Sequence, residues 1–164
     1  MNVVVTASLG ALPAGLAVDP SGRLVVERLY QGTMRCPGNM GLVPRTIAED
    51  GRPLAAIVVG EHALAPGVIV GARPIGVLYV SGSQGDEMTV LCVPAARLTQ
   101  RYDGIVNYKD LPLGDLRTIA HFFLHYRDMD EAARPRSSGW GDVSEARRVV
   151  TEAAGRAASL GAAG

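Results

Sequence analysis

Two histidines have a spacing that is found in metal sites. His121 and His125 are four residues apart, and on a helix this spacing places both imidazoles on one face. Such a pair can bind zinc, but a zinc centre needs at least one further protein ligand. The sequence shows no third ligand at a matching spacing, so the pair alone does not predict a metal centre.

The two cysteines, Cys36 and Cys92, do not have a zinc-binding spacing. A nucleophilic thiol needs a base or a positive charge beside it, and Arg35 is the obvious sequence neighbour of Cys36. We expect Cys36 to be a plain buried thiol, with its reactivity left open by the sequence. Cys92 lies in an apolar run and is expected to pack in the core.

The composition excludes several classes of protein. Sixteen basic and sixteen acidic residues balance to a formal net charge of zero, which does not favour nucleic-acid binding. No apolar run approaches the roughly 20 residues of a membrane span. The first residues, Met1 to Val5, lack the basic start and long apolar stretch of a signal peptide. We therefore expect a cytoplasmic protein that binds neither nucleic acid nor membranes.

Short apolar runs separated by glycine and proline indicate strands in the first two thirds of the chain. Pro74 suggests a bend within one long strand path, and residues 81–86 are expected to form a hairpin loop. Closely spaced strands of this kind favour a small barrel. The expected strands cover residues 3–5, 23–29, 55–59, 68–70, 75–80 and 88–93.

The last third changes to a helical period. Apolar residues from Leu116 to Tyr126 recur on one helical face. A second helix is expected to begin at Asp142, with Glu145 as its capping-box partner. The chain is thus predicted to form a single α+β domain over residues 1–164, with strands first and helices last.

Several ordered segments resemble family I soluble inorganic pyrophosphatases. The segment 36–54, Cys-Pro-Gly-Asn-Met-Gly to Asp-Gly-Arg-Pro-Leu, is similar to the signature region of that family. Further matches lie at 71–78, 109–112, 121–128 and 139–142. The resemblance implies a distorted five-stranded, OB-like β-barrel with two C-terminal helices. It also implies that His121 and His125 lie at a contact between subunits of a homo-oligomer, such as a hexamer.

The resemblance implies a chemistry for which this sequence lacks most of the carboxylates. The family gathers several divalent ions with a ring of carboxylates, because hard Mg²⁺ prefers oxygen ligands. Asp50 keeps the first aspartate of the D-G-D-P-x-D motif, but Arg52 and Ala55 replace the other two. In the hairpin loop Glu87 keeps an acidic position, whereas Gly82 replaces an aspartate.

The phosphate-binding set that the resemblance implies is also reduced. Arg28 is kept, and Tyr126 with Arg127 preserves a Tyr-Lys pair of the family in charge, with arginine in place of lysine. Gly15 and Thr89 stand where lysines are expected, and Met40 replaces a tyrosine.

The sequence therefore favours a pyrophosphatase-like protein that binds or transforms an anionic small molecule, bearing a carboxylate or a phosphate, without a multi-metal cluster or another cofactor. In this hypothesis Arg28, Arg52 and Arg127 bind the anion. Asp50, Glu87 and Tyr126 are the candidate catalytic acids or bases, and Asp50 and Glu87 are the ligands of any single ion.

Two alternatives remain open. One is a surviving Mg²⁺-dependent inorganic diphosphatase, and the other is a catalytically silent subunit that acts through its surfaces. The sequence leaves open whether the protein is an enzyme, which anion it binds, which reaction it performs and which oligomer it forms.

Overall fold

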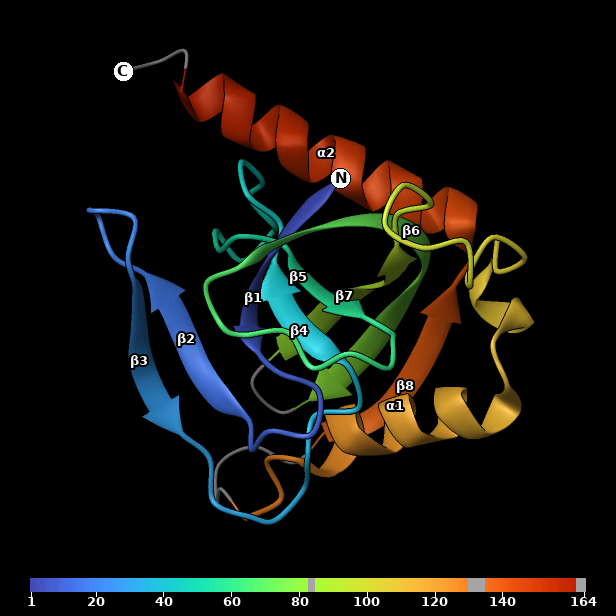
Figure 1. The fold of residues 1–164 in the computed structure, drawn as a ribbon. Helices are drawn as coiled ribbons and strands as arrows, with labels where there is room; N and C mark the ends of the chain where they lie inside the picture. Colours follow the sequence, from blue (N-terminus) through green and yellow to red (C-terminus); the bar gives the residue numbers. More distant parts are fainter. Residues whose placement is uncertain (83–84, 130–134, 162–164) are drawn as a thin grey trace.

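Five strands close into a barrel in the computed structural model, which describes residues 1–82, 85–129 and 135–161. The ring runs β1-β4-β5-β7-β6 and returns to β1, because β1 pairs with both β4 and β6. β5 and β7 pair in parallel, and the other contacts of the ring are antiparallel. With two helices after the five strands of the ring, this arrangement confirms the predicted OB-like α+β fold (Figure 1). In chain order the elements are β1 (Asn2–Ala7), β2 (Ala14–Val18), β3 (Leu24–Leu29), β4 (Asn39–Leu42), β5 (Ala55–Val58), β6 (Ile69–Gly82), β7 (Gly85–Pro94), the 3₁₀-helix η1 (Tyr108–Asp110), α1 (Leu113–His125), β8 (Pro135–Gly141) and α2 (Val143–Gly161).

The buried residues follow the alternation of the strands and the helical spacing that the sequence shows. Along β1 alternate residues point inward, and Val3 and Val5 are fully buried inside the barrel. α2 covers this cluster with small side chains such as Ala146 and Ala153. α1 packs on a second cluster through the apolar face that its helical spacing predicted, with Phe122 also buried.

β6 is one long strand where the sequence suggested two apolar runs. The register between β6 and β7 shifts between Pro74 and Gly76, which confirms the predicted bend. The hairpin to β7 is confirmed, but its strands extend into the predicted loop 81–86, because Ser81 pairs with Asp86 and Gly82 with Gly85. The tip, residues 83–84, lies outside the described residues. β8 pairs with the other edge of β6 and was not predicted, because its Gly- and Ser-rich sequence lacks apolar alternation.

The start of α2 confirms one half of the predicted capping box. The Asp142 side chain accepts a hydrogen bond from the Glu145 backbone N–H at 3.0 Å. The other half is wrong: the Glu145 carboxylate does not return to Asp142, because Tyr79 and Arg148 bind it instead.

The hairpin of β2 and β3 forms a separate two-stranded sheet beside the barrel. Figure 1 shows it standing off from β4, with α2 crossing one end of the barrel and α1 lying near the other. Most of β3 is solvent-exposed, so this hairpin does not contribute to the hydrophobic core. Among the helices of the described residues, none is both long and apolar enough to cross a membrane.

Candidate active site

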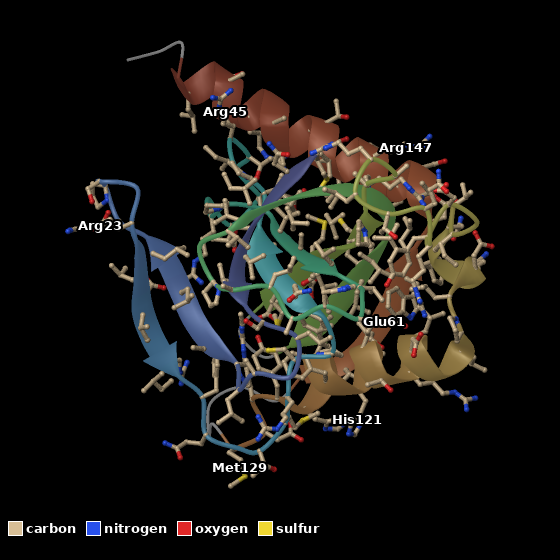
Figure 2. The ribbon with its side chains drawn as sticks, in the orientation of Figure 1. Arg23, Arg45, Glu61, His121, Met129 and Arg147 are labelled. Carbon is tan, nitrogen blue, oxygen red and sulfur yellow. The ribbon has the colours of Figure 1, made fainter. Side chains whose placement is uncertain are left out.

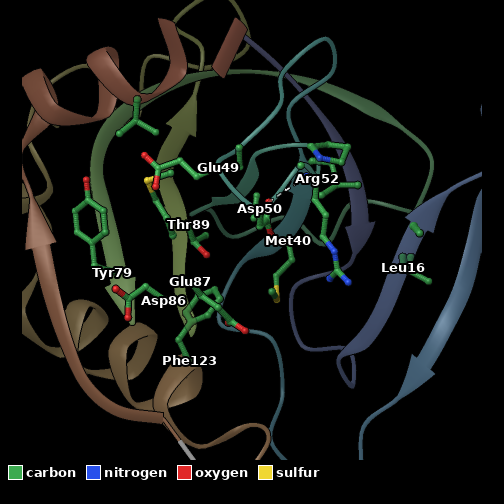
Figure 3. Close-up of a pocket in the computed structure, with 18 of the residues that line it drawn as sticks. Leu16, Met40, Glu49, Asp50, Arg52, Tyr79, Asp86, Glu87, Thr89 and Phe123 are labelled. Carbon is green, nitrogen blue, oxygen red and sulfur yellow. Dashed lines mark hydrogen bonds between the residues drawn. The ribbon is translucent and has the colours of Figure 1, made fainter. Parts of the chain in front are cut away.

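A pocket of about 790 Å³ lies between the barrel, the β2–β3 hairpin and α2. Figure 3 shows Tyr79 and Asp86 on one side of it and Arg52 and Leu16 on the other. Among the described residues its charged lining consists of seven carboxylates and four arginines, a net charge of −3. They are Glu27, Glu49, Asp50, Asp86, Glu87, Glu145 and Glu152, with Arg52, Arg127, Arg148 and Arg156.

A tight turn fixes Asp50 and Arg52 at the edge of this pocket. Gly51 adopts a positive φ of 81°, and the Ala48 backbone N–H donates to the Arg52 carbonyl at 2.7 Å. Asp50 Oδ1 accepts a hydrogen bond from the Arg52 backbone N–H at 3.0 Å. The Arg52 side chain is exposed, extends into the pocket and donates no side-chain hydrogen bond within the described part of the chain. Its charge is thus available to a ligand.

Arg127 is held by a carboxylate and by aromatic rings. Its Nη1 donates to Glu87, and its guanidinium carbon lies 4.9 Å from the centre of the Tyr126 ring and 5.4 Å from that of Tyr30. Its Nε–H is buried and has no acceptor among the residues that the structure describes. Arg127 is therefore firmly positioned, but Glu87 already neutralises part of its charge.

Burial raises the pKa of the Tyr126 hydroxyl well above its usual range. The ring is stacked on Phe122 at 4.9 Å between centroids. Tyr126 stays protonated at neutral pH, so it does not act as a base. Its hydroxyl is available to donate a hydrogen bond.

Arg28 lies on the exposed strand β3 and is not among the residues that line this pocket. Its guanidinium is 5.7 Å from the centre of the Tyr30 ring, the ring against which Arg127 also lies at 5.4 Å. That Arg28 faces the same cavity stays a prediction. The structure does bring together Asp50, Arg52, Glu87, Tyr126 and Arg127.

A polar network at the α2 side of the pocket was missed by the sequence analysis. Tyr79 donates to Glu145 Oε1 at 2.6 Å, and Arg148 bonds both Glu145 at 2.6 Å and Glu152 at 2.7 Å. Burial and the bond to Glu145 raise the pKa of Tyr79 to about 12, and Arg148 lowers the pKa of the Glu145 carboxyl. The spacing of Glu145, Arg148 and Glu152 on one helical face was the available signal.

The carboxylates do not form a preformed metal cluster. Within residues 1–82, 85–129 and 135–161, no group of three Asp, Glu, His or Cys side chains could hold an ion. Glu87 is bonded to Arg127, and one oxygen of Asp50 to the Arg52 backbone. The absence of a multi-metal cluster stays a prediction. Mg²⁺ that arrives on a phosphate group needs only one or two protein carboxylates, and the acidic lining fits that form.

The remaining candidate residues lie away from the pocket. His121 and His125 are exposed on α1, their ring centres 4.5 Å apart, and Figure 2 shows His121 outside the barrel. His125 Nδ1 lies 2.7 Å from Asp128 Oδ2. Their role at a subunit contact stays a prediction. Cys36 is 2% exposed, and burial raises its pKa to about 11, which is the expected property of an unreactive thiol.

The fold and the pocket together define a class of protein: a five-stranded α+β barrel with a wide cleft lined by carboxylates and arginines. The family model of inorganic pyrophosphatase matches residues 14–158. The chain belongs to the inorganic pyrophosphatase family.

Individual relatives agree with this assignment. An inorganic pyrophosphatase of Agrobacterium fabrum is 39% identical over 154 residues, covering 93% of this chain and 87% of the relative. The structure of the Thermus thermophilus inorganic pyrophosphatase superposes with a TM-score of 0.87 at 31% identity, covering 96% of this chain and 90% of that one. The Helicobacter pylori inorganic pyrophosphatase gives a TM-score of 0.90 at 28% identity, with coverages of 96% and 92%.

Proposed function

We propose that this protein binds pyrophosphate together with the Mg²⁺ that accompanies it and hydrolyses it to two phosphate ions. The observation that carries the proposal is the acidic lining of the pocket, a net −3 on the described residues. Such a lining repels a bare anion but accepts one whose charge is neutralised by divalent ions. Relatives at 35–39% identity that are named inorganic pyrophosphatase support the same reaction.

The protein residues have distinct roles in this proposal. Arg52 and Arg127 bind the phosphate oxygens, since guanidinium groups suit bidentate recognition of phosphate. Tyr126, which stays protonated, donates a hydrogen bond to the leaving phosphate. Asp50 has its Oδ1 fixed by the turn, and its Oδ2 accepts a proton from the attacking water. When bound, Mg²⁺ supplies charge neutralisation of the phosphate groups.

A second candidate is a binding protein for a phosphate- or carboxylate-bearing anion without metal, the function that the sequence analysis favoured. Arg52 favours it, because an arginine in the pocket opposes cations and carries a charge that no side chain of the described residues neutralises. The two candidates differ in their dependence on metal.

The test is release of phosphate from pyrophosphate by the purified full-length protein, with Mg²⁺, Mn²⁺ or Zn²⁺ and with chelator. We expect Mg²⁺-dependent release that falls by about a hundredfold or more in Asp50→Asn, the lower range for loss of a proton acceptor. Asp115→Asn, the same change on α1 outside the pocket, is the matched control and should retain full activity.

No release above the Asp50→Asn level would refute the hydrolysis. Calorimetric titration with pyrophosphate in chelator would then test the second candidate, which requires saturable binding that is weakened in Arg52→Gln.

A further inference from the structure

Four apolar side chains line the pocket among its charged groups. They are Leu16 on β2, Met40 and Leu42 on β4, and Ala55 on β5, which pairs with Leu42. All four are half-buried, so each keeps surface that a ligand could cover. We call these four residues the apolar strip.

The strand register places short side chains beside two residues of this strip. Leu42 pairs with Ala55, and Ala55 pairs with Thr89 on β7. Residues paired directly across neighbouring strands project from the same face of a sheet. Leu42, Ala55 and Thr89 therefore form a row of apolar or short side chains that lines the pocket. Figure 3 shows Asp50 between Thr89 and Met40 in the view.

The pocket is far larger than inorganic pyrophosphate. Pyrophosphate occupies on the order of 150 Å³, the share of about five water molecules in the liquid. The pocket measures about 790 Å³, which lies in the range of sites that bind organic molecules. Pyrophosphate alone does not fill this volume, so part of it is available to a substituent of the ligand.

We propose that the pocket accepts an organic diphosphate whose substituent is an alkyl chain, bound with its diphosphate near Asp50, Arg52 and Arg127 and its chain on the apolar strip. The diphosphate end of this inference rests on the proposed function. In the reaction, the water oxygen bonds to the terminal phosphorus as the bond from that phosphorus to the bridging oxygen breaks. The products are an alkyl monophosphate and one phosphate ion.

The chemistry of the strip selects an apolar substituent over a polar one. Its four side chains offer no hydrogen-bond donor and only the weak acceptor of the Met40 thioether, so a sugar or a base placed against them would lose most of its hydrogen bonds to water without replacement. Each methylene that leaves water for this strip strengthens binding by about fourfold.

The test is isothermal titration calorimetry of the full-length protein, in Mg²⁺, with methyl, propyl and pentyl diphosphate, inorganic pyrophosphate and ADP. We expect affinity to rise about fourfold per methylene along the series, and pentyl diphosphate to bind more tightly than ADP. Leu16→Gln and Met40→Gln should each reduce the gain to less than twofold per methylene. Leu29→Gln, an equal change at an exposed site on the same hairpin outside the pocket, should leave it at fourfold.

A flat series in the unmodified protein, or tighter binding of ADP than of pentyl diphosphate, would overturn this inference. If pyrophosphate is hydrolysed and the series is flat, the inference fails and the proposed function stands. If the series rises and no diphosphate releases phosphate, the apolar recognition stands and the proposed hydrolysis fails.

Discussion

Arg52 controls how strongly the pocket attracts divalent cations, and its replacement by aspartate perturbs that property directly. The lining of described residues has a net charge of −3 with Arg52 present. Arg52→Asp removes one positive charge and adds one negative charge at the same place. Asp50, whose Oδ1 binds the backbone N–H of residue 52, does not depend on the side chain that is changed.

The magnitude follows from the size of the pocket. A sphere of about 790 Å³ has a radius of about 6 Å, and two unit charges at that distance interact by roughly 0.7 kcal/mol in water. A two-unit change acting on a doubly charged ion is four times as large, about 3 kcal/mol. Arg52 is exposed, so this water-like value applies, and we expect Mg²⁺ to bind about a hundredfold more tightly at low ionic strength.

Calorimetric titration with MgCl₂ measures this change, with Arg52→Gln as an intermediate that should bind about tenfold more tightly. Arg117→Asp makes the same charge change on α1, outside this pocket, and serves as the control. The reasoning is refuted if Arg52→Asp improves Mg²⁺ affinity by less than threefold, or if Arg117→Asp improves it equally.

Three other properties can be checked on the same protein. A Cβ on Gly41 would collide with the Val4 carbonyl oxygen, so Gly41→Ala should lower the free energy of unfolding, measured in urea, by about 1–3 kcal/mol. Gly155 in α2 has open space around it, so Gly155→Ala should raise the free energy of unfolding by about 0.5–1 kcal/mol. Equal effects of the two substitutions would contradict this. Neither Cys36 nor Cys92 should react with a disulfide reagent at pH 8 in the folded state, because burial raises their pKa values to about 11 and about 12, and both should react in urea; fast labelling without urea would show that a thiol is accessible. Because the pKa of Tyr79 is raised to about 12, the contribution of its hydroxyl to stability is complete below pH 10 and is lost as the pH rises through 12. Tyr79→Phe should therefore make the fall in the urea midpoint of unfolding between pH 9 and pH 11 shallower. An unchanged fall would argue against this role.

The sequence predicted those parts of the fold whose residues repeat at a fixed period. Val3 and Val5 alternate into the barrel, and the apolar spacing around Ile119 and Phe123 places one face of α1 on the core. Short strands without such a pattern could not be found. The four residues of β4 and the Gly- and Ser-rich β8 become strands only because neighbouring strands bind their backbones.

The site was predicted where a motif fixes it locally and missed where distant segments meet. Asp50 and Arg52 share a single turn, so their position follows from the sequence around Gly51. The bond of Tyr79 to Glu145 joins residues 66 positions apart, and no local pattern indicates it. Arg28 was predicted to face this cavity from the resemblance, and its guanidinium lies against the Tyr30 ring, as that of Arg127 does.

The pairing of β1 with β6 also has a consequence for how the chain folds. Val3 pairs with Val70, so the barrel closes only when segments separated by most of the strand region meet. Contacts of such long sequence separation slow folding, because the chain between them loses its freedom before the contact stabilises anything. During synthesis β1 emerges first but lacks one of its two neighbours until β6 has been made. Closure of the ring is therefore a late event, and until then one edge of β1 is open to pairing with other chains.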